Sequence, residues 1–155
     1  MTATKEYSGK TALITGAARG IGFGIARRLG EEGAHILIVD INAEQGLNAV
    51  QSLRQEGLVA DFVHADLSVP GGASNMVNIA AKVTSRIDVL VNNAIAGRRV
   101  GLLDETEENW NLALNVNLTA AFFASQATIR LMADLGGCRI VNVASVAALQ
   151  VTLES

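Results

Sequence analysis

The sequence has little of what several common protein classes need. Its 155 residues include one cysteine, Cys138, which excludes an internal disulfide. Aromatic residues make up only 4%, too few for a surface that stacks nucleic-acid bases. Basic residues are also few: 12 Lys and Arg against 15 Asp and Glu give a net charge of −3. We therefore expect neither a nucleic acid nor a membrane as partner.

Long apolar runs are missing as well. The longest aliphatic run, 36–39, is far shorter than the about 18 apolar residues that cross a bilayer. Residues 1–10 are polar and do not read as a signal peptide. These two absences predict a cytoplasmic protein without a transmembrane span. The hydrophobic content of 50% is enough for one packed core.

Short runs of apolar, β-branched residues alternate with segments of helical period. Five runs read as strands covered on both faces: 11–15, 34–39, 59–65, 87–91 and 139–143. The residues expected to share one face of each helix are Ile21, Ile25 and Leu29; Leu47, Val50 and Leu53; Met76, Ile79 and Val83; and Leu118, Phe122, Ser125, Ile129 and Met132. The alternation predicts an α/β fold, a Rossmann-like doubly wound parallel sheet of about five strands in three αβα layers.

A glycine-rich turn follows the first predicted strand. Gly16, Gly20 and Gly22 are spaced Gly-x-x-x-Gly-x-Gly, directly after Thr15. Glycine supplies positive φ and lets a ligand approach the backbone. A helix beginning at this turn would point its free N–H groups and positive dipole end at a pyrophosphate. The turn therefore predicts a dinucleotide site, with a purely structural turn as the alternative.

Asp40 ends the second predicted strand, where an acidic side chain would accept hydrogen bonds from an adenosine ribose. Its charge would repel a 2′-phosphate, so NAD is favoured over NADP as the cofactor. Arg19, inside the glycine turn, keeps NADP open. The alternative is that Asp40 or Asn42 caps the N-terminus of the second helix.

Several motifs together resemble the short-chain dehydrogenase/reductase family, over essentially the whole chain. Residues 15–22 are similar to its Thr-Gly-x-x-x-Gly-x-Gly, 66–67 to its acidic pair facing the adenine, and 92–94 to most of its Asn-Asn-Ala-Gly. Ile95 departs from the last motif, because it stands where the family normally has Gly. The cofactor-binding residues that the resemblance and the turn imply are Thr15, Gly16, Arg19, Gly20, Ile21, Gly22, Asp40, Asp66, Leu67, Asn92, Asn93 and Ala94.

The resemblance also implies part of a catalytic set. By its spacing from Trp110, Asn117 rather than Asn115 matches the active-site Asn of the family, which holds a water in a proton relay. Ser145 matches the Ser that hydrogen-bonds a substrate carbonyl or hydroxyl. Without the family, these are a polar residue interrupting a helix and a serine at a strand end. The implied reaction transfers a hydride between NAD(H) and a small-molecule alcohol or ketone.

The proton donor of the family, Tyr-x-x-x-Lys, has no counterpart here. The chain ends ten residues after Ser145, residues 151–155 do not read towards such a motif, and the only tyrosine is Tyr7. We interpret 1–155 as a single dinucleotide-binding domain, truncated at its C-terminal end, of an oxidoreductase that at full length is expected to be a homo-oligomer. The alternative is a non-catalytic dinucleotide-binding or interaction module.

Two other polar features are less specific. Arg98 and Arg99, after the fourth predicted strand, could meet an anionic substrate or simply be solvated. His35 and His64 have no second ligand at metal spacing, so no metal is expected.

Overall fold

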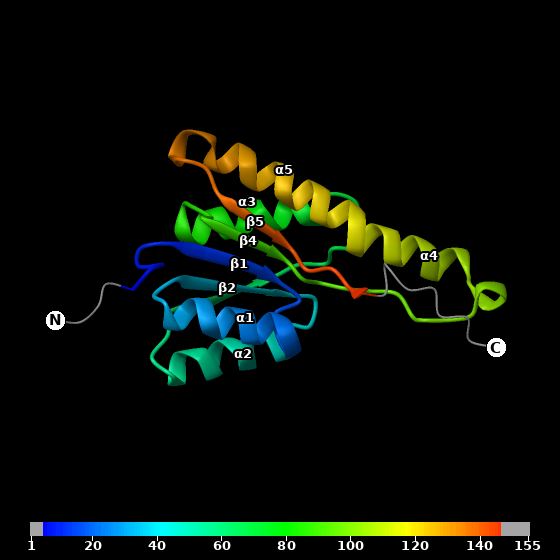
Figure 1. Cartoon of the computed structure of the whole chain (residues 1–155), viewed down its shortest axis with the longest axis horizontal. Coiled ribbons are helices and arrows are strands. Elements are labelled where there is room, and N and C mark those ends of the chain that lie inside the picture. The colour runs from blue at the N-terminus through cyan, green and yellow to red at the C-terminus, as the bar shows by residue number, and fades with distance from the viewer. Residues whose placement is uncertain (1–4, 147–155) are drawn as a thin grey trace.

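Five parallel strands form one sheet in the computed structural model of the chain, which describes residues 5–146 (Figure 1). The strands are β1 (Thr11–Thr15), β2 (His35–Asp40), β3 (Ala60–His64), β4 (Val89–Asn92) and β5 (Arg139–Asn142). Their order in the sheet is β3-β2-β1-β4-β5. All five predicted strands are confirmed, with bounds that agree to within two residues.

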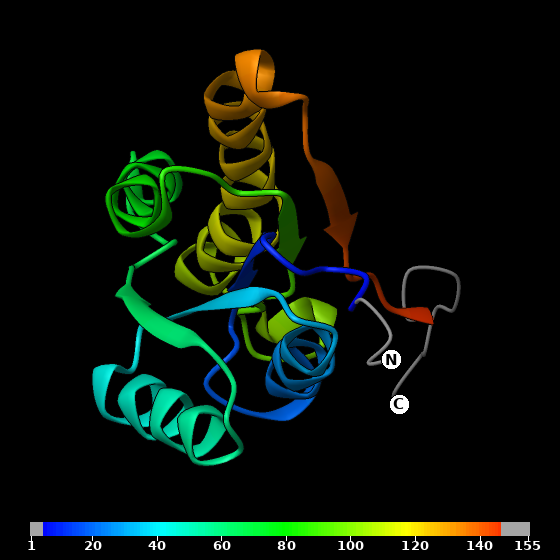
Figure 2. The ribbon, with the colours of Figure 1, turned by 90° about the vertical axis from the view of Figure 1, so that its left-hand side faces the viewer.

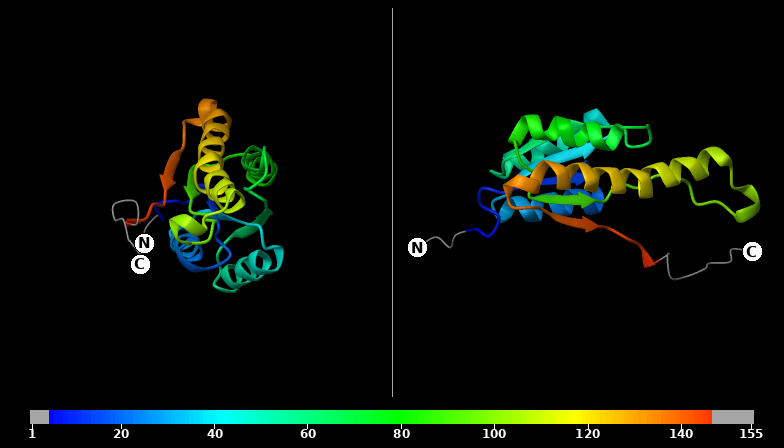
Figure 3. Two further views of the ribbon diagram at one scale, coloured as in Figure 1. Left: turned by 90° about the vertical axis from the view of Figure 1, so that its right-hand side faces the viewer. Right: turned by 90° about the horizontal axis from the view of Figure 1, so that it is seen from above.

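Helices cover both faces of this sheet. They are α1 (Gly20–Glu31), α2 (Ala43–Gln55), α3 (Gly72–Thr84), α4 (Glu107–Leu114) and α5 (Ala120–Met132), with the short turns η1 (Leu102–Asp104), η2 (Asn115–Thr119) and η3 (Ala133–Leu135). Figure 2 shows α1 and α2 on one face and α3 and α5 on the other. The prediction of a doubly wound, three-layer α/β fold is therefore confirmed. In Figure 3, α4 extends beyond the carboxyl ends of the strands.

The central strands β1, β2 and β4 are buried because each contributes side chains to two cores, whereas β5, also expected to be covered on both faces, is mostly exposed because no strand or helix in the described part of the chain covers its outer side. Successive side chains of a strand point to opposite faces of the sheet. In β1, Ile14 packs with the residues beneath α1 and α2, whereas Leu13 packs with those beneath α3 and α5. Ile38 and Leu37 of β2 divide in the same way. The continuous apolar runs in the sequence follow from this covering on both faces.

The helix faces expected from the sequence are wrong in part. Their exposed members are Ile21, Leu47, Val83, Leu118, Phe122 and Ile129. Instead, α5 buries a stripe of mostly small residues, Ala120, Ala124, Thr128 and Met132. This helix is apolar on more than one side, so periodicity alone does not select the face that packs. Small side chains allow α5 to lie close to β4 and α3, and this close approach decides the buried stripe.

One helical stretch, Glu107–Leu135, has the length and composition of a membrane-crossing helix. It is 29 residues long and reaches a mean hydropathy of 1.2. Polar residues interrupt the stretch, so it is not a continuous apolar run in the sequence. In this fold only the α5 part of the stretch covers the sheet, where its buried stripe packs against β4 and α3, and 17% of the apolar window is buried.

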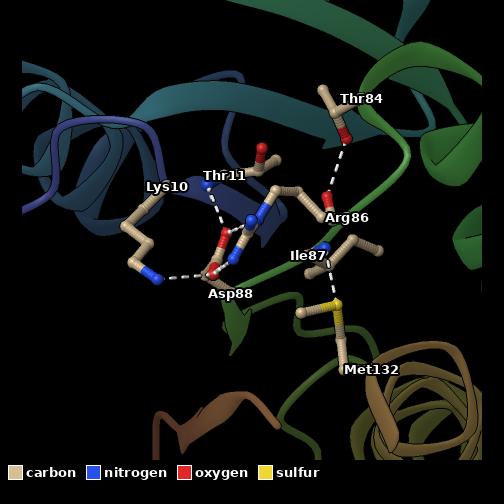
Figure 4. Close-up of polar contacts among 7 residues, drawn as sticks. All are labelled: Lys10, Thr11, Thr84, Arg86, Ile87, Asp88 and Met132. Atoms are coloured by element: carbon tan, nitrogen blue, oxygen red, sulfur yellow. Dashed lines mark hydrogen bonds and ion pairs between the residues drawn. The ribbon is translucent and has the colours of Figure 1, made fainter. Parts of the chain in front are cut away.

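A buried carboxylate, Asp88, connects three strands at their amino ends (Figure 4). Its side chain is 7% exposed and accepts hydrogen bonds from the backbone N of Thr11 (2.9 Å), from Lys10 Nζ (3.2 Å) and from Arg86 Nε (2.7 Å). Its backbone oxygen accepts a hydrogen bond from the N–H of Arg139 (2.8 Å). Asp88 therefore holds together the first residues of β1, β4 and β5.

The contacts of Asp88 determine its ionisation. Burial raises the pKa of this carboxyl, but the hydrogen bonds from Arg86, Thr11 and Lys10, with the charge of Arg86, outweigh burial and lower the pKa from 3.8 to about 2. A carboxyl pKa that is lower in the folded state stabilises the fold above the pKa of the unfolded chain. That stabilisation is lost as the pH falls from about 4 to about 2.

We expect Asp88→Asn to lower the free energy of unfolding by about 2 kcal/mol at pH 7, because the lowered pKa corresponds to that much interaction with the ionised carboxylate. Urea denaturation at a series of pH values measures the effect. The difference from the wild type should shrink between pH 4 and pH 2, whereas exposed Asp134→Asn should change little at any pH. A difference that stays constant down to pH 2 would contradict the role of the charge.

Candidate functional site

A cavity of about 570 Å³ lies at the carboxyl ends of β1, β2, β3 and β4. Its walls come from the glycine turn after β1, the end of β2, and the segments after β3 and β4. Strand order reverses between β1 and β4, since β2 and β3 lie on one side of β1 and β4 and β5 on the other. Ligands of open α/β sheets bind in the crevice at such a reversal.

Most residues predicted to bind a cofactor meet at this cavity. Those that line it are Gly16, Arg19, Ile21, Asp40, Asp66, Leu67, Asn93 and Ala94. The turn residues Thr15, Gly20 and Gly22 stand beside this lining. Lining residues that were not predicted from the sequence include Ile41, Gln45, Ser68, Leu112 and Val116. The last two come from α4 and η2, whose approach to the sheet no local pattern in the sequence indicated.

Thr15 and Asn93 join the turn after β1 to the turn after β4. Thr15 Oγ1 accepts hydrogen bonds from the backbone N of Asn93 and of Ala94, both at 3.0 Å, and donates one to the oxygen of Val91 (3.3 Å). In return, Asn93 Nδ2 donates to the backbone oxygens of Thr15 (2.9 Å) and Gly16 (3.1 Å). These side chains therefore build the cavity by holding its two central walls together.

Two glycines make this close approach possible. A Cβ on Gly16 would lie 2.8 Å from the Cα of Ala94, and the residue has a φ of +62°. A Cβ on Gly22 would lie 2.5 Å from Asn93 Nδ2 and 2.5 Å from the oxygen of Gly16. The glycines thus leave room for the β4 turn, in addition to opening the backbone to a ligand.

The N-terminus of α1 begins at the cavity wall. No side chain among residues 5–146 caps this helix at Arg19, although its first N–H groups have no partners within the helix. Arg19 and Ile21 line the cavity on either side of the helix start. The positive end of the helix dipole and these N–H groups suit a phosphate group.

Asp40 ties the glycine turn to the end of β2. Its Oδ2 accepts a hydrogen bond from the backbone N of Ala18 (3.2 Å), and its Oδ1 accepts one from the backbone N of Asn42 (3.0 Å). The cap of α2 is Asn42, whose Oδ1 accepts a hydrogen bond from the N–H of Gln45 (2.9 Å). Of the two capping residues considered from the sequence, only Asn42 caps the helix, and Asp40 stays in the cavity wall.

Asp66 places a second carboxylate on this wall. Its Oδ1 accepts hydrogen bonds from the hydroxyl of Ser68 (2.6 Å) and from the backbone N of Ser68 (2.8 Å). These two hydrogen bonds, which stabilise the ionised carboxylate, lower the pKa of Asp66. Together with Asp40, it makes this end of the cavity acidic.

Asn117 lies in the π-helical turn η2, between α4 and α5. Its Oδ1 accepts a hydrogen bond from the N–H of Ala96 (2.9 Å), and its Nδ2 donates one to the oxygen of Ala96 (3.0 Å). Ala96 lines the main cavity, whereas Asn115 lines a second cavity of about 340 Å³. Ser145 is exposed three residues after β5, on the side of the sheet where the strands end.

Asn92 stands apart from the other residues expected to bind a cofactor. It is buried, and its Nδ2 donates hydrogen bonds to Asn142 Oδ1 (2.8 Å) and Ser125 Oγ (3.2 Å). These contacts join β4 to β5 and α5, behind the cavity wall. Asn92 ends β4 and directs its side chain to β5 and α5, whereas Asn93, just after the strand, contacts the glycine turn and lines the cavity.

Comparison with known proteins identifies a matching family and similar proteins. The sequence pattern of the short chain dehydrogenase family matches residues 10–154. The 5-keto-D-gluconate 5-reductase of Escherichia coli (strain K12) is 40% identical over 140 residues, which cover 90% of this chain and 55% of that protein. Dehydrogenase/reductase SDR family member 4 of Rattus norvegicus is 38% identical over 148 residues, 95% of this chain and 53% of that protein. The chain thus spans about half the length of these curated relatives.

Solved structures share the fold. A gluconate 5-dehydrogenase from Burkholderia cenocepacia, in complex with NADP and tartrate, has a TM-score of 0.86 at 34% identity and covers 96% of this chain. NAD+-bound xylitol dehydrogenase has a TM-score of 0.87 at 33% identity and also covers 96% of this chain. The aligned parts are 58% and 57% of those two chains.

We expect Gly22→Ala to lower the free energy of unfolding by about 1–3 kcal/mol, because the added Cβ overlaps Asn93 and Gly16 and forces the two turns apart. Gly24→Ala is the matched control, since it lies in the same helix with nothing within 4 Å of its added Cβ. Gly24→Ala should raise the free energy of unfolding by about 0.5–1 kcal/mol. Equal effects of the two substitutions in urea denaturation would show that the turns are not packed as described.

Proposed function

The chain belongs to the short chain dehydrogenase family, and from this premise we propose that it binds the dinucleotide in an oxidoreductase that transfers a hydride between NAD(H) and an alcohol or ketone. The observation that carries the proposal is the cavity between the turns after β1 and β4, which are held together by Thr15 and Asn93.

Successive walls of the cavity suit the pyrophosphate, the adenosine and the second nucleoside of a dinucleotide. The pyrophosphate would lie against the glycine turn and the uncapped start of α1. The adenosine would extend towards Asp40 at the end of β2, and Asp66 and Leu67 would meet its base. Asn93 and Ala94 would border the other nucleoside, near Asn117 in η2.

We further propose NAD rather than NADP as the cofactor. Asp40 lines the cavity, and its Oδ2 is oriented by the hydrogen bond from the backbone N of Ala18 in the glycine turn. A carboxylate at the end of the second strand accepts hydrogen bonds from ribose hydroxyls. The same charge would repel a 2′-phosphate. Arg19 is the basic residue that the described lining offers to NADP, and one solved relative binds NADP whereas another binds NAD+.

We expect Asp40→Ala to weaken NAD binding about tenfold, through the loss of charge-assisted hydrogen bonds to the ribose. NADP binding should weaken less, because the repulsion of its 2′-phosphate disappears at the same time. Calorimetric dissociation constants for both dinucleotides measure the ratio, with Asp134→Ala as an exposed control. Equal losses for NAD and NADP would refute the ribose role, since Asp40 also holds the turn at Ala18.

The first substrates to test are hydroxy and keto acids. Arg98 and Arg99 are exposed in the segment that follows the cavity wall, where a substrate carboxylate could meet them. A relative from Escherichia coli is named for a keto sugar acid, and a solved relative binds tartrate.

The reaction needs a proton donor besides the dinucleotide, because hydride transfer to a ketone leaves an alkoxide. Ser145 would hydrogen-bond the reacting oxygen, and Asn117 would hold a water of the proton relay. The only tyrosine of the chain, Tyr7, packs against the core on the α1 side, just before β1, and so lies at the opposite edge of the sheet. The position of the cavity supports dinucleotide binding by the chain, and Tyr7 lies too far from it to serve as the proton donor.

The experiment that tests the function uses the gene product as the cell makes it, with its intact mass measured first. We expect NADH oxidation with keto acids or other ketones, reduced at least about a hundredfold by Ser145→Ala, on the scale of losing one positioned catalytic hydrogen-bonding group. A product that binds NADH but turns over no member of the panel would favour the non-catalytic binding module.

A further inference from the structure

The segment after β4 is held against the following helix by two asparagines that bind it in the same way. Asn117 forms two hydrogen bonds with the backbone of Ala96, as described above. Asn109, in the first turn of α4, repeats this arrangement on Arg98: its Oδ1 accepts a hydrogen bond from the N–H of Arg98 (2.7 Å), and its Nδ2 donates one to the oxygen of Arg98 (3.0 Å). Each amide therefore satisfies both polar groups of one residue in a segment that has no strand partner of its own.

Between these two contacts, Gly97 lies directly against the helix. A Cβ on Gly97 would be 2.9 Å from the Cβ of Ala113, and the residue has a φ of +99°. The helix residues Asn109, Ala113 and Asn117 are spaced four apart and therefore share one face. We call these three residues the clamp. Residues 96–98 run along the clamp in the direction opposite to the helix.

The amide of Asn109 is oriented by its neighbours. Its Nδ2 also donates a hydrogen bond to Glu105 Oε1 (2.8 Å). A carboxylate can only accept, so the amide nitrogen must face Glu105, which leaves Oδ1 for the N–H of Arg98. The position of Asn109 along the helix is set as well, because Thr106 Oγ1 accepts a hydrogen bond from its backbone N (3.1 Å) and caps α4.

The segment held by the clamp is one wall of the cavity. Ala94, Ile95 and Ala96 all line it, and Ile95 is 82% exposed despite its large apolar side chain. Packing therefore contributes little to holding Ile95 in place. Its position depends on the backbone contacts on either side, made by Thr15 to Ala94 and by the clamp to residues 96–98.

We propose that Asn109 is a positioning residue of the dinucleotide site: with Ala113 and Asn117 it holds residues 96–98 so that Ile95 and Ala96 form a fixed wall. The inference rests on the proposed function, because the wall is argued to face a dinucleotide. Asn117 holds the chain only at Ala96, before Gly97. Gly97 is a pivot of high conformational freedom, and Asn109 holds the chain beyond it.

The experiment compares NADH affinity among variants of the full chain by fluorescence titration. We expect Asn109→Ala to raise the Kd for NADH about threefold to tenfold, through the loss of the two hydrogen bonds to Arg98 and one to Glu105. Asn111→Ala is the matched control, since this asparagine is exposed on the same helix. Its Kd should stay within about a factor of 1.5 of the wild-type value, in keeping with a surface change that touches no such contact.

Two further measurements separate positioning from general stability. Asn109→Asp keeps an acceptor for the N–H of Arg98, loses the donor to its oxygen and brings a second carboxylate to Glu105, so its Kd should also rise. In the gene product, Asn109→Ala should raise the KM for NADH while changing kcat by less than about twofold, as expected when uniform binding is lost. A parallel fall of kcat with unchanged KM would overturn the proposal.

The outcomes distinguish this proposal from the proposed function. A wild-type chain that binds no NADH refutes dinucleotide binding itself. A wild-type chain that binds NADH, with an equal Kd for Asn109→Ala, refutes only the role of the clamp. If Asn109→Ala does not fold, exposed Glu105→Ala decides the matter, because it removes the group that orients the amide, together with one hydrogen bond from the backbone N of Thr106, and leaves both hydrogen bonds of Asn109 to Arg98 possible. An unchanged Kd in that variant would overturn the proposal, whereas a rise of about twofold would support it.

Discussion

The candidate site depends on the link between Thr15 and Asn93. These residues follow neighbouring strands at the point where the strand order reverses, and they lie 78 positions apart in the chain. The hydrogen bonds between them bring the β4 turn so close to the glycine turn that Gly16 and Gly22 have no room for a Cβ. Two other walls of the cavity are joined to the turns that this pair holds together. The end of β2 joins it through Asp40 and Ala18, and α4 joins it through Asn117 and Ala96.

Polar groups have different roles at the amino ends and at the carboxyl ends of the strands. Where the strands begin, Asp88 is buried among Lys10, Arg86 and the N–H of Thr11, and its charge is satisfied within the fold. Where the strands end, the carboxylates of Asp40 and Asp66 accept backbone or hydroxyl hydrogen bonds and still line a cavity. A charge that is enclosed by partners stabilises the sheet, whereas a charge with open sides can also meet a ligand.

Patterns of short range in the sequence predicted most of the architecture, and they failed where a helix has more than one apolar side. Runs of apolar residues located the five strands, and covering on both faces explains the runs of the central strands β1, β2 and β4, although β5 is mostly exposed. For α5 the apolar residues predicted the wrong buried face: Phe122 and Ile129 are exposed, and Ala120 and Ala124 are buried. Asn92 and Asn93, which have identical side chains, could also not be distinguished from the sequence: in the fold Asn92 contacts Asn142 of β5, whereas Asn93 contacts the glycine turn.

The sequence by itself determined the alternation of strands and helices, the glycine turn, the acidic residue at the end of β2 and the resemblance to the family, because each is written in residue types at fixed local spacing. Only the tertiary structure decided which side chains line the cavity and how Asn109 and Asn117 hold the segment after β4. The physical reason is the distance along the chain: a hydrogen bond between a helix and a loop depends on how the two approach over the sheet, and no local period of the backbone records that approach.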